Sequence, residues 1–197
     1  MKTITQQDIT AVILAGGQAR RMQGQDKGLL KYQGQHFIQH LVQGLSSQVS
    51  HIIVNANRNQ QQYAELTQCP VISDSFGHFA GPLAGMLTGL QTAQTPYVLF
   101  LPCDVPFVPD FLVSRLAHVL ANSQAHLCTV DDGQRTQYLF ALMRRDVQDH
   151  LHTYLKQDKH QVKAWYQQQH VMTADFADCP QYFANINTPA DLQNITS

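Results

Sequence analysis

The sequence predicts an α/β fold built on a mainly parallel sheet. Short β-type runs alternate with helix-length segments along the chain, which is the pattern of strand–helix–strand units. Several of these runs are continuously apolar, as strands are when both faces of their sheet are covered. Because the 197 residues contain no internal repeat and no low-complexity linker, we expect one domain spanning residues 1–197.

The predicted elements follow one another in a regular order. The first strand, Ile9–Leu14, is a short apolar run that leads to two glycines. Further strands are predicted at Ile52–Asn55, Val71–Ser73, Tyr97–Leu101, His126–Val130, Tyr138–Leu142 and Tyr182–Asn185. Helical patterns lie between them at Gln35–Gln48, Gln60–Thr67, Leu83–Ala93, Pro109–Asn122 and Arg145–Leu155.

Composition argues against several classes of protein. Hydrophobic residues make up 44% of the chain and charged residues 14%, which argues against disorder. A net charge of −1 argues against a broad nucleic-acid surface, and no apolar run approaches the length of a membrane span. The four cysteines show no close pairing, so we expect neither a zinc site nor a disulfide framework, and we expect a cytoplasmic protein.

Ligands of such sheets bind beyond the carboxyl ends of the strands, where loops and helix N-termini converge. Four strand-to-helix turns carry chemically active residues there: Ala15–Gly28, Asn55–Arg58, Asp74–Gly81 and Pro102–Pro106. In the first, Gly16 and Gly17 allow backbone amides to approach an anion closely. Three cations follow them, Arg20, Arg21 and Lys27. These residues suit a polyphosphate, although neither the P-loop nor the dinucleotide motif is present. The alternative is a tight turn followed by a solvated basic loop.

Asp104 is the second candidate, directly after the most apolar predicted strand. A carboxylate at this position could hold Mg²⁺ together with phosphate oxygens. Alternatively, it could serve as a turn residue or cap a helix that begins near Pro109. We expect the neighbouring Cys103 to be a buried apolar residue and not a nucleophile.

Several other features have two interpretations. Gly85 and Gly89 lie one turn apart, which suits either tight helix packing or the approach of a ligand. Asn55 and Asn57 are spaced so that both amides point to one face if the backbone is extended. Trp165 could form an aromatic wall for a heterocycle, but we expect it to pack in the core. His36 and His40 are one helical turn apart but lack the Glu that zinc-binding helices carry between such histidines, so we do not expect a metal site there.

One stretch identifies a known family by resemblance. Leu14-Ala15-Gly16-Gly17-x-Ala19-Arg20-Arg21-Met22-x-Gly24-x-Asp26-Lys27-Gly28 is similar to the signature of the molybdenum cofactor guanylyltransferase (MobA) family. The similarity runs nearly end to end, through residues 54–58, 81–85, 102–106 and 185–189. There are two departures: Gln23 replaces a common glycine, and Tyr138 replaces a proline that many relatives carry.

The resemblance implies a Rossmann-like three-layer α/β/α sandwich. It implies transfer of GMP from MgGTP to the phosphate of molybdenum-molybdopterin, with release of pyrophosphate. The GTP contacts it implies are Leu14, Ala15, Gly16, Lys27, Asn55, Asp74 and Asp104. Asp104 would also bind Mg²⁺, Arg21 and Lys27 would act at the phosphates, and Asn185 and Asn187 would lie toward the pterin. Molybdoenzyme maturation proteins are candidate partners.

The residues also admit other functions. One alternative is a different nucleotidyltransferase, acting with CTP on the same pterin or with a nucleotide on a sugar phosphate. Another is a non-catalytic carrier that binds GTP and molybdopterin. The resemblance and the Asp104 turn favour the guanylyltransferase.

Overall fold

A seven-stranded sheet forms the centre of the molecule in a computed structural model that describes residues 3–15, 26–76 and 81–184. The strand order is β5-β4-β1-β6-β8-β7-β9. The strands are β1 (Ile9–Leu14), β4 (His51–Asn55), β5 (Val71–Ile72), β6 (Tyr97–Pro102), β7 (Leu127–Asp131), β8 (Thr136–Arg144) and β9 (Val171–Asp175). Within this sheet only β8 runs against its neighbours. The predicted mainly parallel sheet is therefore confirmed.

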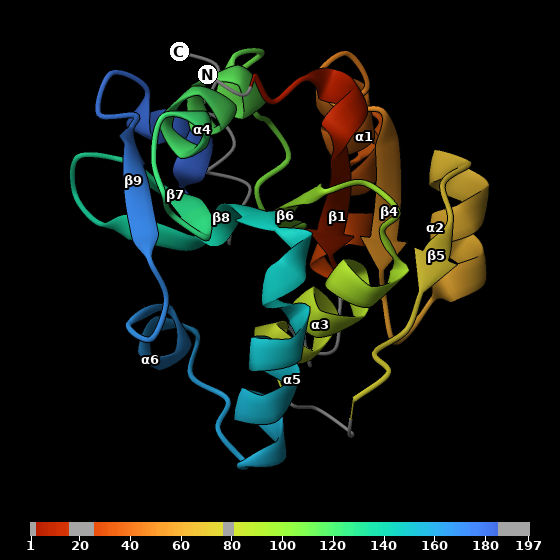
Figure 1. Ribbon diagram of the computed structural model, residues 1–197. Helices are drawn as coiled ribbons and strands as arrows, with labels where there is room; N and C mark the ends of the chain where they lie inside the picture. Colours follow the sequence, from red (N-terminus) through yellow and green to blue (C-terminus); the bar gives the residue numbers. More distant parts are fainter. Residues whose placement is uncertain (1–2, 16–25, 77–80, 185–197) are drawn as a thin grey trace.

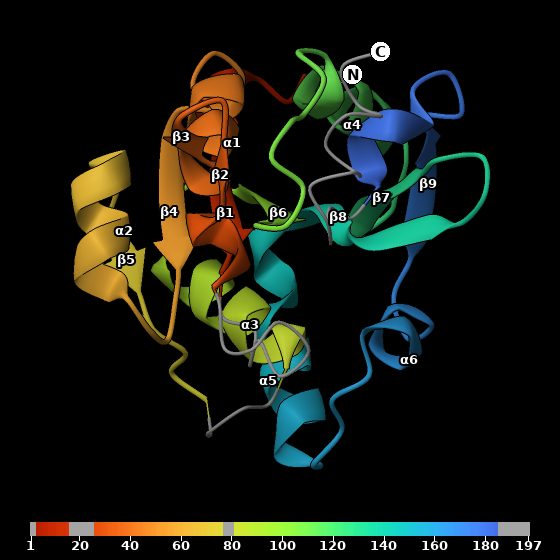
Figure 2. The ribbon, with the colours of Figure 1, turned by 180° about the vertical axis from the view of Figure 1, so that it is seen from behind.

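Helices cover both faces of the sheet, giving three layers (Figure 1). The helices are α1 (Phe37–Leu45), α2 (Gln60–Thr67), α3 (Pro82–Thr92), α4 (Leu112–Ala121), α5 (Gln148–Lys156) and α6 (Val162–Tyr166). Figure 2 shows from behind that α1 and α4 lie on one face of the sheet and α3 and α5 on the other. This arrangement confirms the α/β/α sandwich.

The two faces of β1 explain the layers. Ala11 and Ile13 belong to the core under α1 and α4, whereas Val12 belongs to the core under α3 and α5. Successive residues of a strand point to opposite faces, so a continuously apolar strand buries both. All three side chains are fully buried. The continuously apolar run of β1 therefore reflects the helices that cover both faces of the sheet.

The glycines of α3 are explained by close packing on the sheet. A Cβ atom on Gly89 would lie 2.8 Å from Phe100 Cε1 and 3.0 Å from Val12 Cγ2. A Cβ atom on Gly85 would overlap Asn55 Oδ1. Tight packing of the helix on the sheet therefore accounts for Gly89. The missing side chain of Gly85 leaves room for the side chain of Asn55.

One predicted strand and the start of one predicted helix were wrong. The strand expected at Tyr182–Asn185 is, over its described part, a 3-10 helix (Pro180–Phe183) whose Phe183 packs against Phe140 and Phe176. The last strand of the described residues is instead β9, a half-exposed edge strand that pairs with β7. Helix α4 begins at Leu112, after the predicted start at Pro109.

The start of the first long helix was also wrong. Residues Lys31–Tyr32 and Gln35–His36 form a small hairpin, β2–β3, around Gln33 and Gly34. Both turn residues have positive φ, 49° and 84°, as a two-residue hairpin turn requires. Helix α1 therefore begins at Phe37. In the described ranges no helix has the length and apolarity needed to cross a bilayer.

Candidate functional site

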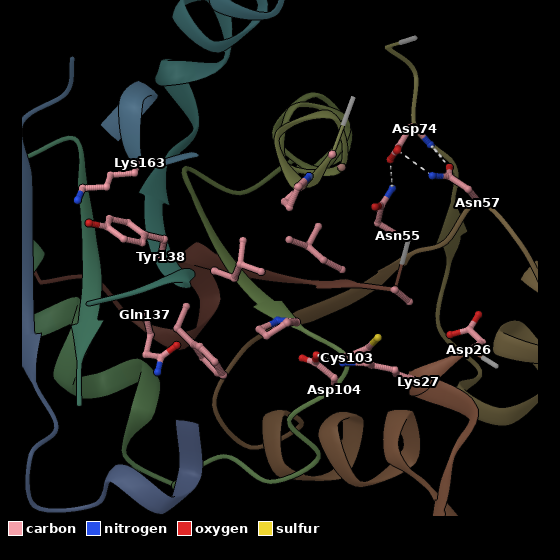
Figure 3. A pocket seen from close by; sticks show the side chains of 18 of the residues that line it. Asp26, Lys27, Asn55, Asn57, Asp74, Cys103, Asp104, Gln137, Tyr138 and Lys163 are labelled. Carbon is pink, nitrogen blue, oxygen red and sulfur yellow. Dashed lines mark hydrogen bonds and ion pairs between the residues drawn. The ribbon is translucent and has the colours of Figure 1, made fainter. Parts of the chain in front are cut away.

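A cleft of about 970 Å³ lies at the carboxyl ends of β1, β4 and β6 (Figure 3). The strand register aligns these ends, because Leu14 pairs with Asn55 on one side and with Pro102 on the other. Six of the seven GTP contacts that the resemblance implies line the cleft: Leu14, Ala15, Lys27, Asn55, Asp74 and Asp104. Four strand-to-helix turns thus converge on one site, as the position of ligands in such sheets predicts.

Other expected site residues lie outside the described residues. These are Gly16, Gly17, Arg20, Arg21, Gln23, Asn185 and Asn187. Their roles stay predictions.

Lys27 and Asp104 form an ion pair at the floor of the cleft. Lys27 Nζ lies 2.9 Å from Asp104 Oδ2, and the two side chains are 27% and 16% exposed. Asp104 follows β6 directly, while the N-cap of α4 is Phe111, so Asp104 does not cap that helix. The pair sets one positive and one negative group side by side in a partly buried site, where charges are weakly screened.

Asp74 is held by two asparagine amides. Asn55 Nδ2 donates to Asp74 Oδ1 at 3.0 Å, and Asn57 Nδ2 donates to Asp74 Oδ2 at 2.8 Å. Asn57 Oδ1 in turn accepts from the Asp74 backbone amide at 2.9 Å. The Asn55 side chain is itself buried. Both asparagines therefore point to one side, as their spacing predicts, but they orient a carboxylate (Figure 3).

A third carboxylate, Asp26, lines the cleft beside Lys27. The Tyr63 hydroxyl donates to Asp26 Oδ1 at 2.5 Å, and Asn59 Nδ2 donates to Asp26 Oδ2 at 3.3 Å. Burial, together with the neighbouring Cys103 and Asp26, holds the pKa of Tyr63 far above its usual range. Tyr63 therefore remains a hydrogen-bond donor. Sequence reasoning assigned no role to either residue, because their contact joins a loop to a helix far along the chain.

The opposite wall comes from β8 and α6. Gln137 and Tyr138 of β8 and Lys163 of α6 line it, with Arg135 at the turn before β8. The sequence indicated residues 136–138 only as a departure from the family pattern, and it carried no signal for Lys163.

Gln137 is oriented by a buried carboxylate, Asp132. Gln137 Nε2 donates to Asp132, whose Oδ1 also accepts from the backbone amides of Gln134 and Arg135. Burial alone would raise the pKa of Asp132, but these hydrogen bonds and the Arg135 charge lower it. The turn before β8 is thus built around an ionised Asp132.

The remaining candidates are structural. Trp165 is fully buried, as predicted, and its Nε1 donates to His150 Nδ1. His36 and His40 each bond a backbone carbonyl, and the described residues contain no group of three metal-ligating side chains. The four cysteines are free, and burial raises the pKa of Cys103. Cys103 is therefore a buried thiol.

The mostly parallel sheet with helices on both faces (Figure 1) matches a Rossmann-like α/β nucleotidyltransferase fold. Residues 11–172 match the model of the MobA-like NTP transferase domain, and the chain belongs to that family.

Proteins named molybdenum cofactor guanylyltransferase are similar over nearly the whole chain. The one from Pasteurella multocida is 45% identical over 184 residues, which cover 93% of this chain and 97% of the relative. The one from Shewanella frigidimarina is 43% identical, with 96% of each chain covered.

Solved structures share the fold at low sequence identity. Molybdopterin-guanine dinucleotide biosynthesis protein A from Archaeoglobus fulgidus superposes with a TM-score of 0.75 at 20% identity, covering 94% of this chain and 96% of that one. A 4-diphosphocytidyl-2C-methyl-D-erythritol synthase from Anaerococcus prevotii superposes with a TM-score of 0.68 at 13% identity, covering 96% and 94%.

Proposed function

We propose that this protein transfers GMP from GTP to the phosphate of molybdenum-molybdopterin, forming the molybdopterin guanine dinucleotide cofactor and pyrophosphate. The family and the names of the similar proteins support the activity. The observation that carries it to this chain is one cleft lined by the Lys27–Asp104 pair and the Asn55–Asp74–Asn57 cluster.

GTP would bind over the ends of β1, β4 and β6. Leu14, Ala15 and Gly16 would meet it with backbone groups, and Asn55 would hold Asp74 toward it. The Asp74 carboxylate is an acceptor only, which suits N–H or O–H groups of a nucleoside. Lys27 and Arg21 would then meet the phosphates, since cations bind phosphate oxygens with charge-assisted hydrogen bonds.

Asp104 would hold Mg²⁺. Its partly buried carboxylate is the right donor type, because Mg²⁺ takes one or two carboxylates, substrate phosphates and water. The described residues offer no cluster of three ligands, so the fit is to an ion shared with the nucleotide. When bound, the ion neutralises phosphate charge.

The reaction needs orientation and electrostatics more than covalent chemistry. A phosphate oxygen of molybdopterin attacks the α-phosphorus of GTP in line. The new O–P bond forms as the bond between the α-phosphorus and the bridging oxygen breaks, and that oxygen leaves with pyrophosphate. Lys27 and Arg21 stabilise the charge that develops on the phosphates. No side-chain nucleophile is required.

The acceptor would enter from the wall formed by Gln137, Tyr138 and Lys163, with Asn185 and Asn187 toward the pterin. Lys163 would offer a cation to an anionic acceptor. We place the reaction in the cytoplasm, with maturation proteins of molybdoenzymes as candidate recipients of the product.

The test is pyrophosphate release from GTP, CTP and ATP, with and without molybdopterin and in Mg²⁺ or EDTA. We expect release only from GTP with molybdopterin, lost in EDTA and restored by Mg²⁺. Release from CTP would favour the cytidylyl alternative. Binding of GTP and molybdopterin with no release would favour a carrier.

A further inference from the structure

The Tyr63 hydroxyl occupies a space that only glycine at position 28 leaves open. Tyr63 is fully buried on α2, and it is the only buried residue of that helix. A Cβ atom on Gly28 would lie 2.5 Å from Tyr63 Oη and 3.2 Å from the ring. Contacts under about 3 Å do not occur without movement of one partner. Gly28 therefore admits the hydroxyl to Asp26, two residues earlier.

Asp26 needs such a partner because of where it lies. It lines the cleft beside Lys27, where an unrestrained carboxylate would repel phosphates and attract the Lys27 ammonium. Its backbone is extended, with φ −77° and ψ 117°, and neighbouring side chains of an extended chain point to opposite sides.

Hydrogen bonds hold Asp26 in this orientation. The Tyr63 hydroxyl donates to Asp26 Oδ1, and Asn59 Nδ2 donates to Asp26 Oδ2. Both donors come from α2 or the residue before it. Lys27 meanwhile reaches Asp104. Figure 3 shows Asp26 at the edge of the cleft and Lys27 extending toward Asp104.

We infer that Tyr63 is a positioning residue for nucleotide binding: it restrains Asp26 so that Lys27 is directed to the phosphates. The inference rests on the proposed function for the identity of the ligand. It is independent of the acceptor, because Tyr63 lies on the α2 side, away from the wall of Gln137 and Lys163.

The first test is Tyr63→Phe, which removes the hydroxyl and keeps the buried ring. We expect KM and the directly titrated Kd for GTP to rise about tenfold, the change expected from one hydrogen bond, while KM for molybdopterin stays the same. A purely structural role would lower the melting temperature or the active fraction and leave both KM values unchanged. An unchanged Kd for GTP would overturn the inference.

The matched control is Tyr154→Phe. Tyr154 of α5 is also buried, and its hydroxyl donates to the Gln161 carbonyl at 3.3 Å. Deleting this hydroxyl should change the melting temperature without changing Kd for GTP.

A second substitution, Asp26→Asn, tests whether the effect of Tyr63→Phe on GTP binding comes from the Asp26 charge or from altered packing. In the Tyr63→Phe variant, Asp26→Asn removes the carboxylate charge that Tyr63 no longer restrains. The Kd for GTP should therefore return to within about twofold of the native value. A double variant weaker than either single variant would contradict the mechanism.

Gly28→Ala tests independently whether the Tyr63 hydroxyl needs the space that Gly28 leaves. It should raise Kd for GTP in the native protein and do so less in the Tyr63→Phe background. If the native protein binds GTP but releases no pyrophosphate, the proposed function fails and the titrations still decide the role of Tyr63.

Discussion

At the scale of single residues, the site depends on charges placed side by side with defined partners. Lys27 pairs with Asp104, Tyr63 with Asp26, and two asparagines with Asp74. Each carboxylate of the cleft is therefore oriented by a donor. Such preorganisation lets a site stabilise phosphate charge without rearranging during the reaction.

Asp104→Ala tests the most important of these residues. We expect turnover to fall at least about 100-fold, since Asp104 would hold the ion that neutralises the phosphates. The fold should remain, because the Asp104 side chain lies in the cleft and not in the core. Pyrophosphate release and the circular dichroism spectrum measure the two effects.

The control for this variant is Asp110→Ala, on the same connection but exposed. It should turn over at the native rate. Near-normal turnover of Asp104→Ala would remove Asp104 from the mechanism.

At the scale of elements, the turn between β7 and β8 depends on Asp132. The folded-state pKa of this carboxyl is lowered, so its contribution to stability is present above the unfolded pKa and is lost as the pH falls through the folded value. We expect Asp132→Asn to cost about 1–3 kcal/mol at neutral pH. The difference should shrink below about pH 4.

Urea unfolding of the native protein and Asp132→Asn, from neutral pH into acid, measures this prediction. Stability curves that run parallel through the acid range would show that Asp132 carries no pH-linked stability.

Helix α3 on the sheet gives a contrast between two glycines. Gly89→Ala would set a methyl group 2.8 Å from the buried Phe100 ring, and we expect a loss of about 1–3 kcal/mol from overpacking. Gly44→Ala on α1 would meet one methyl group of Val108 at 3.1 Å and the Val108 carbonyl oxygen at 4.0 Å. Since alanine favours helices by about 1 kcal/mol over glycine, it should be neutral or stabilising in thermal unfolding. Equal losses at both positions would contradict the packing argument.

The sequence predicted the elements with strong local signals and missed those that depend on tertiary contacts. Strand β1 and helix α2 have the predicted bounds, because apolar runs and helical patterns are local. Strand β9 was missed because Val171–Asp175 is half exposed and not continuously apolar. Phe183 and its neighbours resembled a strand, but their burial comes from packing against Phe140 and Phe176.

The same division holds for the site. Lys27, Asn55, Asp74 and Asp104 were singled out because they lie in turns after strands whose carboxyl ends meet. The family resemblance supplied Leu14 and the expected contacts with GTP. Tyr63, Gln137 and Lys163 were not assigned roles, since only the packing of α2, β8 and α6 brings them to the cleft.

At the scale of the whole molecule, the residues that stabilise the fold and the polar residues of the cleft lie in different places. Two apolar cores, one on each face of the sheet, support the layers. The polar groups gather at the strand ends, where a cleft of about 970 Å³ opens. This volume is at the upper end of the range for small-molecule sites, about 300–1,000 Å³, and it has two chemically different walls, which suits a nucleotide and an acceptor.

The most direct test of guanylyl transfer follows the α-phosphorus. GTP labelled at that atom is incubated with the native protein, molybdopterin and Mg²⁺, and the products are separated and weighed by mass spectrometry. We predict that the label enters a molybdopterin guanine dinucleotide, with one pyrophosphate released per dinucleotide formed. Label recovered only as GTP, GDP or free GMP, with no dinucleotide, would contradict the proposed transfer.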